Sequence, residues 1–327
     1  MRYWWVNQNQ TYRQETEGGY LWAPKRRRDG ARNAFYDFMR EVAPGDIVFS
    51  FADTWIRKIG IAEDYCRECP KPAEFGAAGR AWDDIGWRVR VRFFELARPI
   101  RPRDWMPQLR PHLAAKHSPL RADGGGNQIY LAAIPDALAL ALGGIIGREF
   151  EQLSATARTF SQSANTGIYA QDEDVRSWES HEEAQVEQAP DLPETEREAL
   201  IQARVGQGLF RENVFRIEHR CRVTGVTDPA HLRASHTKPW RSSSHDERLN
   251  GENGLLLTPS IDHLFDRGFI SFEDQGTLLV SPIANHEALE RMGVPCTRTI
   301  RVGQFSTGQA HFLEYHRNNI FLSRRTG

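Results

Sequence analysis

The chain has 327 residues, of which 40% are hydrophobic and 26% charged, and its formal net charge is −1. A chain of this length is expected to form two domains. No apolar run approaches the roughly 20 residues needed to span a bilayer, and residues 1–10 lack the features of a signal peptide. Four cysteines in so long a chain argue against a disulfide framework. We therefore expect a cytoplasmic protein that associates with no membrane.

Charge is distributed unevenly along the sequence. Residues 1–121 contain 22 Lys/Arg and 15 Asp/Glu, and residues 201–327 contain 16 and 13. Residues 172–200 contain only 2 Arg against 11 Asp/Glu. Two mildly basic regions thus flank an acidic segment, and a basic excess favours a nucleic-acid partner.

The first 60 residues look β-rich and begin a domain that extends to about residue 146. Aromatic, β-branched and alternating runs predict strands at 3–6, 46–51, 57–62 and 88–96. Helical spacing of apolar residues predicts helices at 33–42 and around 137–146. Cys66 and Cys69 form a C-x-x-C, but no second pair lies nearby, so we expect no structural zinc.

Aromatic residues are concentrated in this region: Trp4, Trp5, Tyr20, Trp22 and Trp55. Any one of them is more readily a core residue than a ligand-binding one. As a group they exceed what a small β-domain needs for its core, which leaves some to stack on a flat ligand such as a base. Tyr20 and Trp22 are expected on the same side of an extended segment.

The segments YWWVNQNQTY, GYLWAPK and PGDIVFSFADTWIRKIGIAE resemble the EVE domain, a small β-barrel of the PUA-like superfamily. The resemblance covers about residues 1–147. Related folds hold a modified or flipped nucleobase in an aromatic cage. The resemblance implies that the base pocket is formed by some of six residues, without settling which: Trp5, Asn7, Tyr20, Trp22, Ser50 and Trp55.

Residues 148–194 are predicted to be a linker that is partly helical and strongly acidic. The stretch 172–198 contains Pro190 and Pro193 and has little apolar periodicity, which is typical of a spacer between domains. A helix is predicted at 194–205.

The stretch 221–272 holds the side chains that carry chemistry. A short strand ends at His236, and Asn253 opens a second strand over 254–257. Thr258 and Pro259 suit the cap and first position of a helix, on which Asp262 and Asp266 share a face and His263 lies adjacent. The pattern predicts a ββα unit.

Hydrolysis of a phosphodiester needs a base that activates water and a cation that stabilises charge on the phosphate. A neutral histidine, with an ordinary pKa of about 6.5, suits the first task. Hard oxygen ligands from Asp and Asn suit Mg²⁺ or Mn²⁺. Alternatively, the amide of Asn253 holds in place the loop that carries the base.

ASHTKPW, RLNGENGLLL and IDHLFDRGFISF resemble, in this order, the HNH endonuclease motif over roughly residues 195–285. The resemblance implies a ββα-metal nuclease with His236 as general base and Asn253 as the motif's middle asparagine. It implies Asp262 as the preferred metal ligand and His263 as the alternative. Ser235 stands where related nucleases often carry a metal-binding His or Asp, which leaves His231 and Asp266 as further candidates.

Together these patterns predict an α+β protein: an EVE-like domain (1–147), a linker (148–194) and an HNH endonuclease domain (195–327). The two resemblances imply a modification-dependent restriction endonuclease of the type IV kind. The first domain would flip a modified cytosine, 5-methyl or 5-hydroxymethyl, out of double-stranded DNA. The second would cut with Mg²⁺, Mn²⁺ or another transition metal, as a homodimer. The alternatives are an HNH nuclease for RNA or for nicked or branched DNA, and a non-catalytic reader of modified bases.

Overall fold

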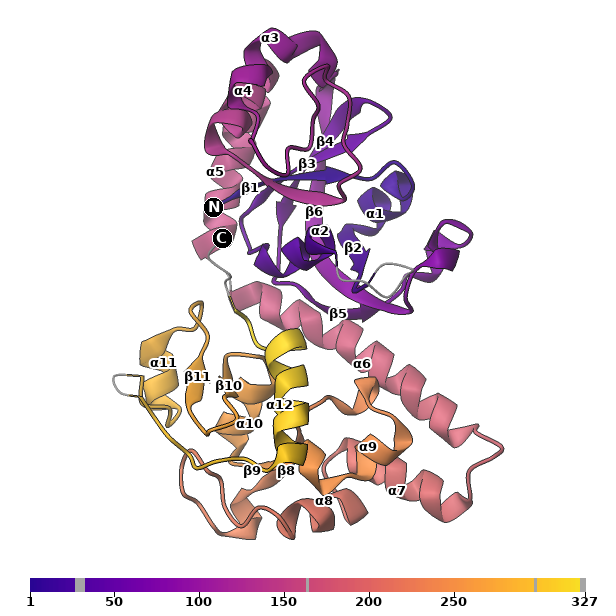
Figure 1. The fold of residues 1–327 in the computed structure, drawn as a ribbon, viewed down its shortest axis with the longest axis vertical. Helices are drawn as coiled ribbons and strands as arrows, with labels where there is room; N and C mark the ends of the chain where they lie inside the picture. Colours follow the sequence, from indigo (N-terminus) through magenta and orange to yellow (C-terminus); the bar gives the residue numbers. More distant parts are fainter. Residues whose placement is uncertain (27–32, 163–164, 297–298, 324–327) are drawn as a thin grey trace. The chain divides into compact units, whose positions relative to one another are not determined.

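A computed structural model describes residues 1–26, 33–162, 165–296 and 299–323 (Figure 1). The chain divides into two compact units, residues 1–174 (unit 1) and 175–327 (unit 2). The boundary falls inside the long helix α6 (Asn165–Glu187). The predicted domains 1–147 and 195–327 each lie within one unit.

The described residues of unit 1 form seven strands: β1 (Tyr3–Asn7), β2 (Tyr20–Pro24), β3 (Ile47–Ala52), β4 (Trp55–Ala62), β5 (Arg67–Pro70), β6 (Ile85–Ile100) and β7 (Leu131–Ile134). Its helices are α1 (Tyr12–Gly18), α2 (Ala34–Asp37), α3 (Met106–Leu109), α4 (Asp136–Ile146) and α5 (Arg148–Gln162). The four strands predicted in this region correspond to β1, β3, β4 and β6 and are confirmed. The predicted helix at 33–42 is shorter, because α2 gives way to a 3₁₀ turn over Phe38–Glu41.

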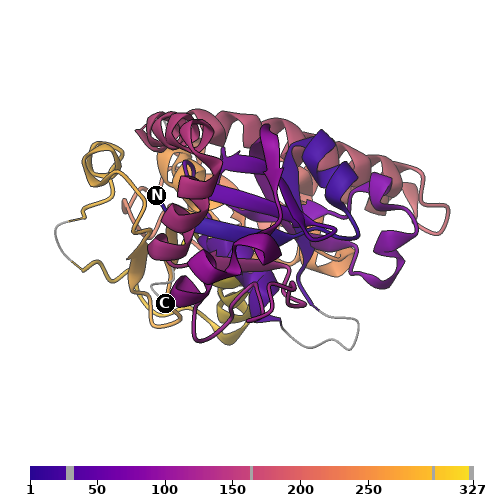
Figure 2. The same ribbon diagram turned by 90° about the horizontal axis from the view of Figure 1, so that it is seen from above.

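The strands form one sheet in the order β2-β6-β4-β3-β1-β7, with β5 also paired to β6. All neighbours are antiparallel except β1 and β3, which run parallel. The sheet curls into a half-barrel (Figures 1 and 2). Helices α4 and α5 pack against it, and the Phe150 ring of α5 stacks on Phe49 of β3 at 5.9 Å. Gly143 permits this approach, since a Cβ there would lie 2.3 Å from the Phe150 ring.

Unit 2 contains the remaining helices and strands: α7 (Glu194–Arg204), α8 (Gly208–Phe215), β8 (Arg233–His236), α9 (His245–Leu249), β9 (Gly254–Leu257), α10 (Pro259–Asp266), β10 (Ile270–Phe272), β11 (Leu278–Val280), α11 (His286–Arg291) and α12 (Thr307–Asn319). β8 pairs antiparallel with β9, and α10 follows at once. The predicted ββα unit and the α+β class are therefore confirmed. In the part of the chain that the structure describes, no helix is both long and apolar enough to cross a membrane.

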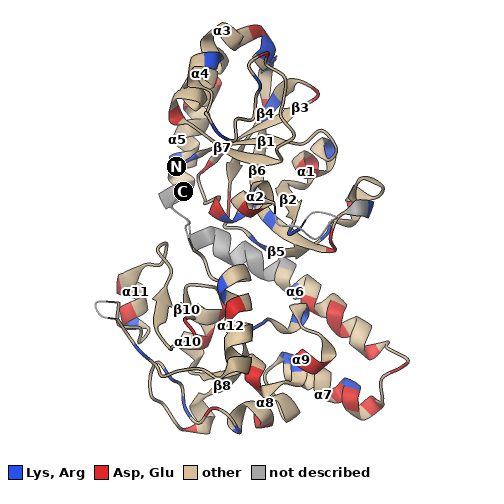
Figure 3. Cartoon of the chain, viewed as in Figure 1, with Lys and Arg blue, Asp and Glu red and all other residues tan. Residues whose placement is uncertain are grey.

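The second half of α6 belongs to the core of unit 2. Trp178 is 5% exposed and Val186 is 2% exposed, and Val186 packs with the buried side chains of α7, α8 and the ββα unit. The apolar face of this half of α6 is short, and for that reason the sequence predicted a spacer. Acidic residues are spread along this half of the helix (Figure 3), and three of them, Glu179, Glu182 and Glu183, form ion pairs with arginines of unit 2.

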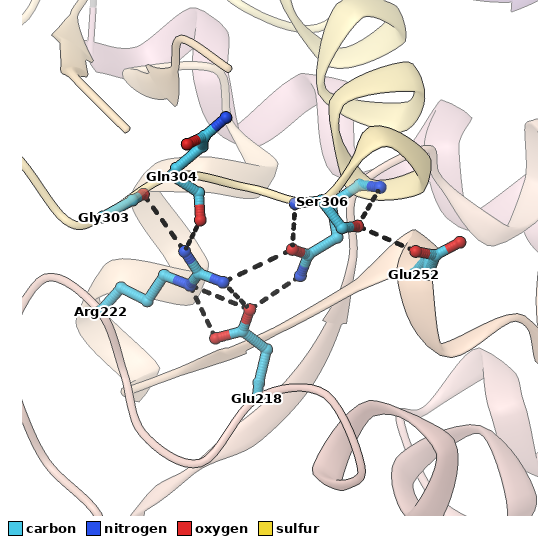
Figure 4. Close-up of polar contacts among 7 residues, drawn as sticks. Glu218, Arg222, Glu252, Gly303, Gln304 and Ser306 are labelled. Carbon is cyan, nitrogen blue, oxygen red and sulfur yellow. Dashed lines mark hydrogen bonds and ion pairs between the residues drawn. The ribbon is translucent and has the colours of Figure 1, made fainter. Parts of the chain in front are cut away.

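A polar network around the buried Glu218 and Gln309 ties α12 to the segment after α8 (Figure 4). Arg222 donates from Nε to both carboxylate oxygens of Glu218, at 2.9 and 2.8 Å. Gln309 of α12 donates to the same carboxylate at 2.7 Å. Ser306 caps α12 and also donates to Glu252 at 2.8 Å. The charges are paired and hydrogen-bonded, as buried charges must be.

Candidate active site

His236 ends strand β8 and lies against Phe210 of α8. The two rings are parallel within 4°, with their centroids 3.7 Å apart. Gly254 is the cross-strand partner of His236, and a Cβ at that position would lie 2.9 Å from the Phe210 ring. Glycine at position 254 therefore leaves room for Phe210 to stack on His236.

The hydrogen bond of His236 fixes its tautomer. Nε2 lies 3.0 Å from the backbone carbonyl oxygen of Arg248. Because a carbonyl can only accept, Nε2 carries the proton and Nδ1 keeps its lone pair. Among the described residues, none makes a hydrogen bond to this Nδ1. Burial lowers the pKa of His236 to about 4, so the ring is neutral at neutral pH and can act as a base.

Asn253 is fully buried and bonded along the loop between β8 and α9. Its Oδ1 accepts from the backbone N–H of Lys238 at 2.8 Å. Its Nδ2 donates to the carbonyls of Lys238 and Glu247, at 3.2 and 3.1 Å, and lies 3.3 Å from Ser243 Oγ. These contacts agree with the loop-pinning reading of Asn253. A direct part in the reaction stays a prediction.

Helix α10 lies across β8 so that two strand residues face two carboxylates. Arg233 donates to Asp262 at 3.1 Å, and the Ser235 hydroxyl donates to Asp266 at 3.2 Å. Arg233 and Ser235 lie on the same face of β8, two residues apart. Asp262 and Asp266 lie one turn apart on α10, so each strand residue contacts one carboxylate. Ser235 takes part in this arrangement through Asp266.

Asp262 and Asp266 form a carboxylate pair that suits a hard cation. The pKa of Asp266 is raised by the protein atoms around its carboxyl group and then by the charge of Asp262, although the residue as a whole remains exposed. A cation would relieve this repulsion, and the Ser235 hydroxyl offers a third oxygen. The described residues contain no cluster of three or more His, Cys, Asp and Glu suited to a metal. Mg²⁺ commonly uses only one or two carboxylates with water and phosphate, so the pair fits it.

The two other metal candidates are exposed histidines. His263 follows Asp262 on α10, and His231 lies in the 3₁₀ turn before β8. Their roles as ligands stay predictions.

In unit 1 the six predicted pocket residues have different surroundings. Trp5 is 1% exposed and packs against Phe51 at 5.0 Å. Asn7 donates to the carbonyl of Asn127 at 3.1 Å. Trp55 is half-buried on β4, which β6 separates from β2. Their roles in binding a base stay predictions.

Ser50 belongs to a buried polar chain. It donates to Gln8 at 2.6 Å, and Gln8 in turn bonds to Glu15. Glu15 also accepts from the backbone N–H of Trp22 at 3.0 Å and from the hydroxyl of Tyr130 at 2.5 Å. Burial raises the pKa of Glu15 to about 7. The chain therefore holds β2 in place beneath its aromatic side chains.

Tyr20 and Trp22 do meet, in a cluster with two aromatics that the sequence did not single out. Phe75 lies 6.2 Å from Tyr20 and 5.6 Å from Trp22. Trp82, half-buried, faces Trp22 at 6.1 Å and 29°. Phe75 and Trp82 come from irregular segments between β5 and β6, where no periodicity could mark them.

Residues 221–273 match a family model of HNH endonucleases, a family that generally uses a divalent metal. The match supports a nuclease function. No curated protein matches the sequence.

Solved structures similar to this chain share little sequence with it. They include a protein from Pseudomonas putida (13% identity, TM-score 0.32, 44% of this chain and 99% of that chain). The Pho92 YTH domain in complex with m6A has 9% identity and a TM-score of 0.32, over 44% and 85% of the two chains. A protein from Agrobacterium tumefaciens has 15% identity and a TM-score of 0.27, over 45% and 94%. At TM-scores this low, nothing about the ligands of this chain follows from these structures.

Proposed function

We propose that the chain is a modification-dependent DNA endonuclease. Unit 2 would hydrolyse phosphodiesters, and unit 1 would admit a modified cytosine, 5-methyl or 5-hydroxymethyl. The proposed nuclease activity rests on one observation. The ββα unit that contains Asp262 and Asp266 also contains His236, whose Nδ1 is unprotonated. The family match over 221–273 supports the same reading.

In the proposed reaction, Nδ1 of His236 takes a proton from the water that attacks the phosphorus. The Nε2–H bond to the Arg248 carbonyl keeps the ring oriented and stabilises the imidazolium that forms. Asp262 and Asp266 would hold Mg²⁺ or Mn²⁺, which when bound stabilises charge on the phosphate and the leaving oxygen. Cutting both strands takes two such sites, so a homodimer is part of the proposal.

For recognition we propose the aromatic cluster of Tyr20, Trp22, Phe75 and Trp82. The Trp22 and Trp82 rings are already within stacking range of each other. A flipped base therefore enters when the more exposed Trp82 swings aside. The guanidinium of Arg88 lies over the Tyr20 ring at 4.6 Å and places a cation beside the cluster for the DNA backbone.

The direct test is digestion of one plasmid in three forms, unmodified, 5-methylcytosine and 5-hydroxymethylcytosine, with Mg²⁺ or Mn²⁺. We expect cleavage of at least one modified form and little of the unmodified form. Equal cutting of all three would overturn the dependence on modification while leaving the nuclease in place.

Two further substrates test the alternatives. Cleavage of RNA, or of nicked or branched DNA, in preference to modified duplex would replace the substrate but keep the His236 chemistry. Tight binding of modified DNA without any cleavage would leave a non-catalytic reader.

A further inference from the structure

Arg233 is in direct contact with the carboxylate pair of the candidate site. Its Nη1 donates to Oδ2 of Asp262 at 3.1 Å. Two residues further along β8, the hydroxyl of Ser235 donates to Asp266 at 3.2 Å. The two carboxylates therefore meet one cationic and one neutral side chain from the same face of the strand.

The partners of the Arg233–Asp262 ion pair differ in exposure. The side chain of Arg233 is 63% exposed, whereas that of Asp262 is 12% exposed. Among the described residues, the bond to Asp262 is the one hydrogen bond of a guanidinium that has five N–H donors. Arg233 can therefore leave Asp262 by breaking a single exposed ion pair, a contact of small stabilising value.

A divalent cation and the Arg233 guanidinium would compete for Asp262. Both bind carboxylate oxygens, and Mg²⁺ takes its oxygen ligands at about 2.0–2.1 Å. Two positive groups at one carboxylate repel each other, so binding of the cation weakens the ion pair. Ser235 is different, because its hydroxyl is neutral and can stay beside Asp266.

A phosphodiester is the anion that would replace Asp262 as the partner of Arg233. A cation held by Asp262 and Asp266 takes phosphate oxygens among its other ligands. The phosphate then lies close to Arg233, whose guanidinium starts 3.1 Å from Asp262. A guanidinium binds phosphate and carboxylate oxygens in the same planar, two-pronged geometry.

We propose that Arg233 is a phosphate-binding residue of the nuclease site and that Asp262 holds it until a divalent cation takes its place. Asp262 thereby couples the two events, since the carboxylate that accepts the cation also releases the arginine toward the phosphate. The proposal rests on the proposed nuclease function and adds a substrate-binding residue to it.

The first measurement is metal binding in the absence of nucleic acid. Isothermal titration calorimetry with Mn²⁺ compares the full chain with its Arg233→Ala variant. Removal of the competing guanidinium should tighten Mn²⁺ binding about two- to fivefold, the value of an exposed ion pair. Arg291→Ala is the matched control, because it removes an exposed arginine that pairs with Glu287 on α11 at 2.6 Å. It should leave Mn²⁺ binding unchanged.

The second measurement is the affinity for a DNA duplex, by fluorescence anisotropy in the His236→Ala background. With saturating Mn²⁺, Arg233→Ala should weaken binding about tenfold, the effect of losing a hydrogen-bonded charged contact. The slope of log K against log salt concentration should also become shallower by about 0.9, which corresponds to one phosphate. In EDTA, where Asp262 retains Arg233, the substitution should have no more effect than Arg291→Ala.

Two results would overturn the proposal. One is an affinity for Mn²⁺ that Arg233→Ala leaves unchanged or weakens, and the other is an equal loss of DNA affinity with and without Mn²⁺. Thermal unfolding of each variant identifies any that fail to fold, and tighter metal binding cannot come from unfolding. If the chain cuts no nucleic acid at all, the nuclease proposal fails, whereas the two titrations still decide the role of Arg233.

Discussion

Two histidines of unit 2 are packed in nearly the same way. His236 lies parallel to Phe210 at 3.7 Å, and His316 lies parallel to Phe265 at 3.8 Å, each within 4°. Nε2 of each ring lies 3.0 Å from a backbone carbonyl oxygen, which makes it the protonated nitrogen. Burial lowers the pKa of both, to about 4 for His236 and about 3 for His316.

They differ at Nδ1. In His316 the Ser271 hydroxyl lies 2.9 Å from Nδ1, and the residue is 1% exposed. His236 is only partly buried, and no described residue bonds its Nδ1. Stacking and a carbonyl bond thus orient a histidine equally well for structure or for chemistry. An accessible lone pair separates the two uses.

The largest expected effect comes from deleting each ring. His236→Ala should lower cleavage by about 10²–10⁴-fold, because it removes the general base. His316→Ala should instead lower the free energy of unfolding by about 2–4 kcal/mol, since it leaves a cavity and unpaired buried groups. Cleavage assays and denaturant unfolding on both variants check this. Full activity of His236→Ala would remove it from the reaction.

A smaller effect should follow from changing the stacked ring. Phe210→Leu and Phe265→Leu should each cost about 1–2 kcal/mol of stability. Only Phe210→Leu should also slow cleavage, by about tenfold, because a misplaced base loses its alignment with water. The pKa of His236 should rise in this variant as water enters. If both variants cut equally well per folded molecule, the stacking has no part in catalysis.

The smallest expected effect is a shift of the acid limb of the pH–rate profile. His236 must be neutral to act, so the acid limb of kcat/KM should lie near pH 4 and not near 6.5. A lowered pKa means that the folded state favours the neutral ring. That contribution to stability is present above pH 6.5 and is lost as the pH falls through about 4. The pH–rate profile, with imidazole NMR shifts, measures both, and an acid limb near 6.5 would place the base elsewhere.

Much of unit 2 could be predicted from sequence because its signals are local. Thr258-Pro259 begins a helix, and the spacing from 262 to 266 sets two carboxylates on one face. The role of Asn253 depended on which groups its amide meets, and these lie 6 to 15 residues away along the chain. No local pattern encodes those partners.

The members of the aromatic cluster were harder to predict for the same reason. Trp5 and Trp22 are both 1% exposed, and the sequence does not show that Trp5 packs beside Phe51 whereas Trp22 faces the half-buried Trp82. The cluster is completed by Phe75 and Trp82, which β5 and β6 bring to β2 through long-range pairing. Strand pairing, not periodicity, decides which aromatics meet.

The buried carboxyl of Glu15, beneath β2, gives unit 1 a dependence on acidity opposite to that of the histidines. Its pKa is about 7 when folded, against 4.5 ordinarily, so folding retains the proton more tightly. This favours the folded state below pH 4.5, by an amount on the order of 3 kcal/mol, and the advantage is lost as the pH rises through about 7. Mild acid therefore favours the folded state of unit 1 through this carboxyl, and calorimetry should find the unfolding transition of unit 1 at a higher temperature at pH 5 than at pH 8.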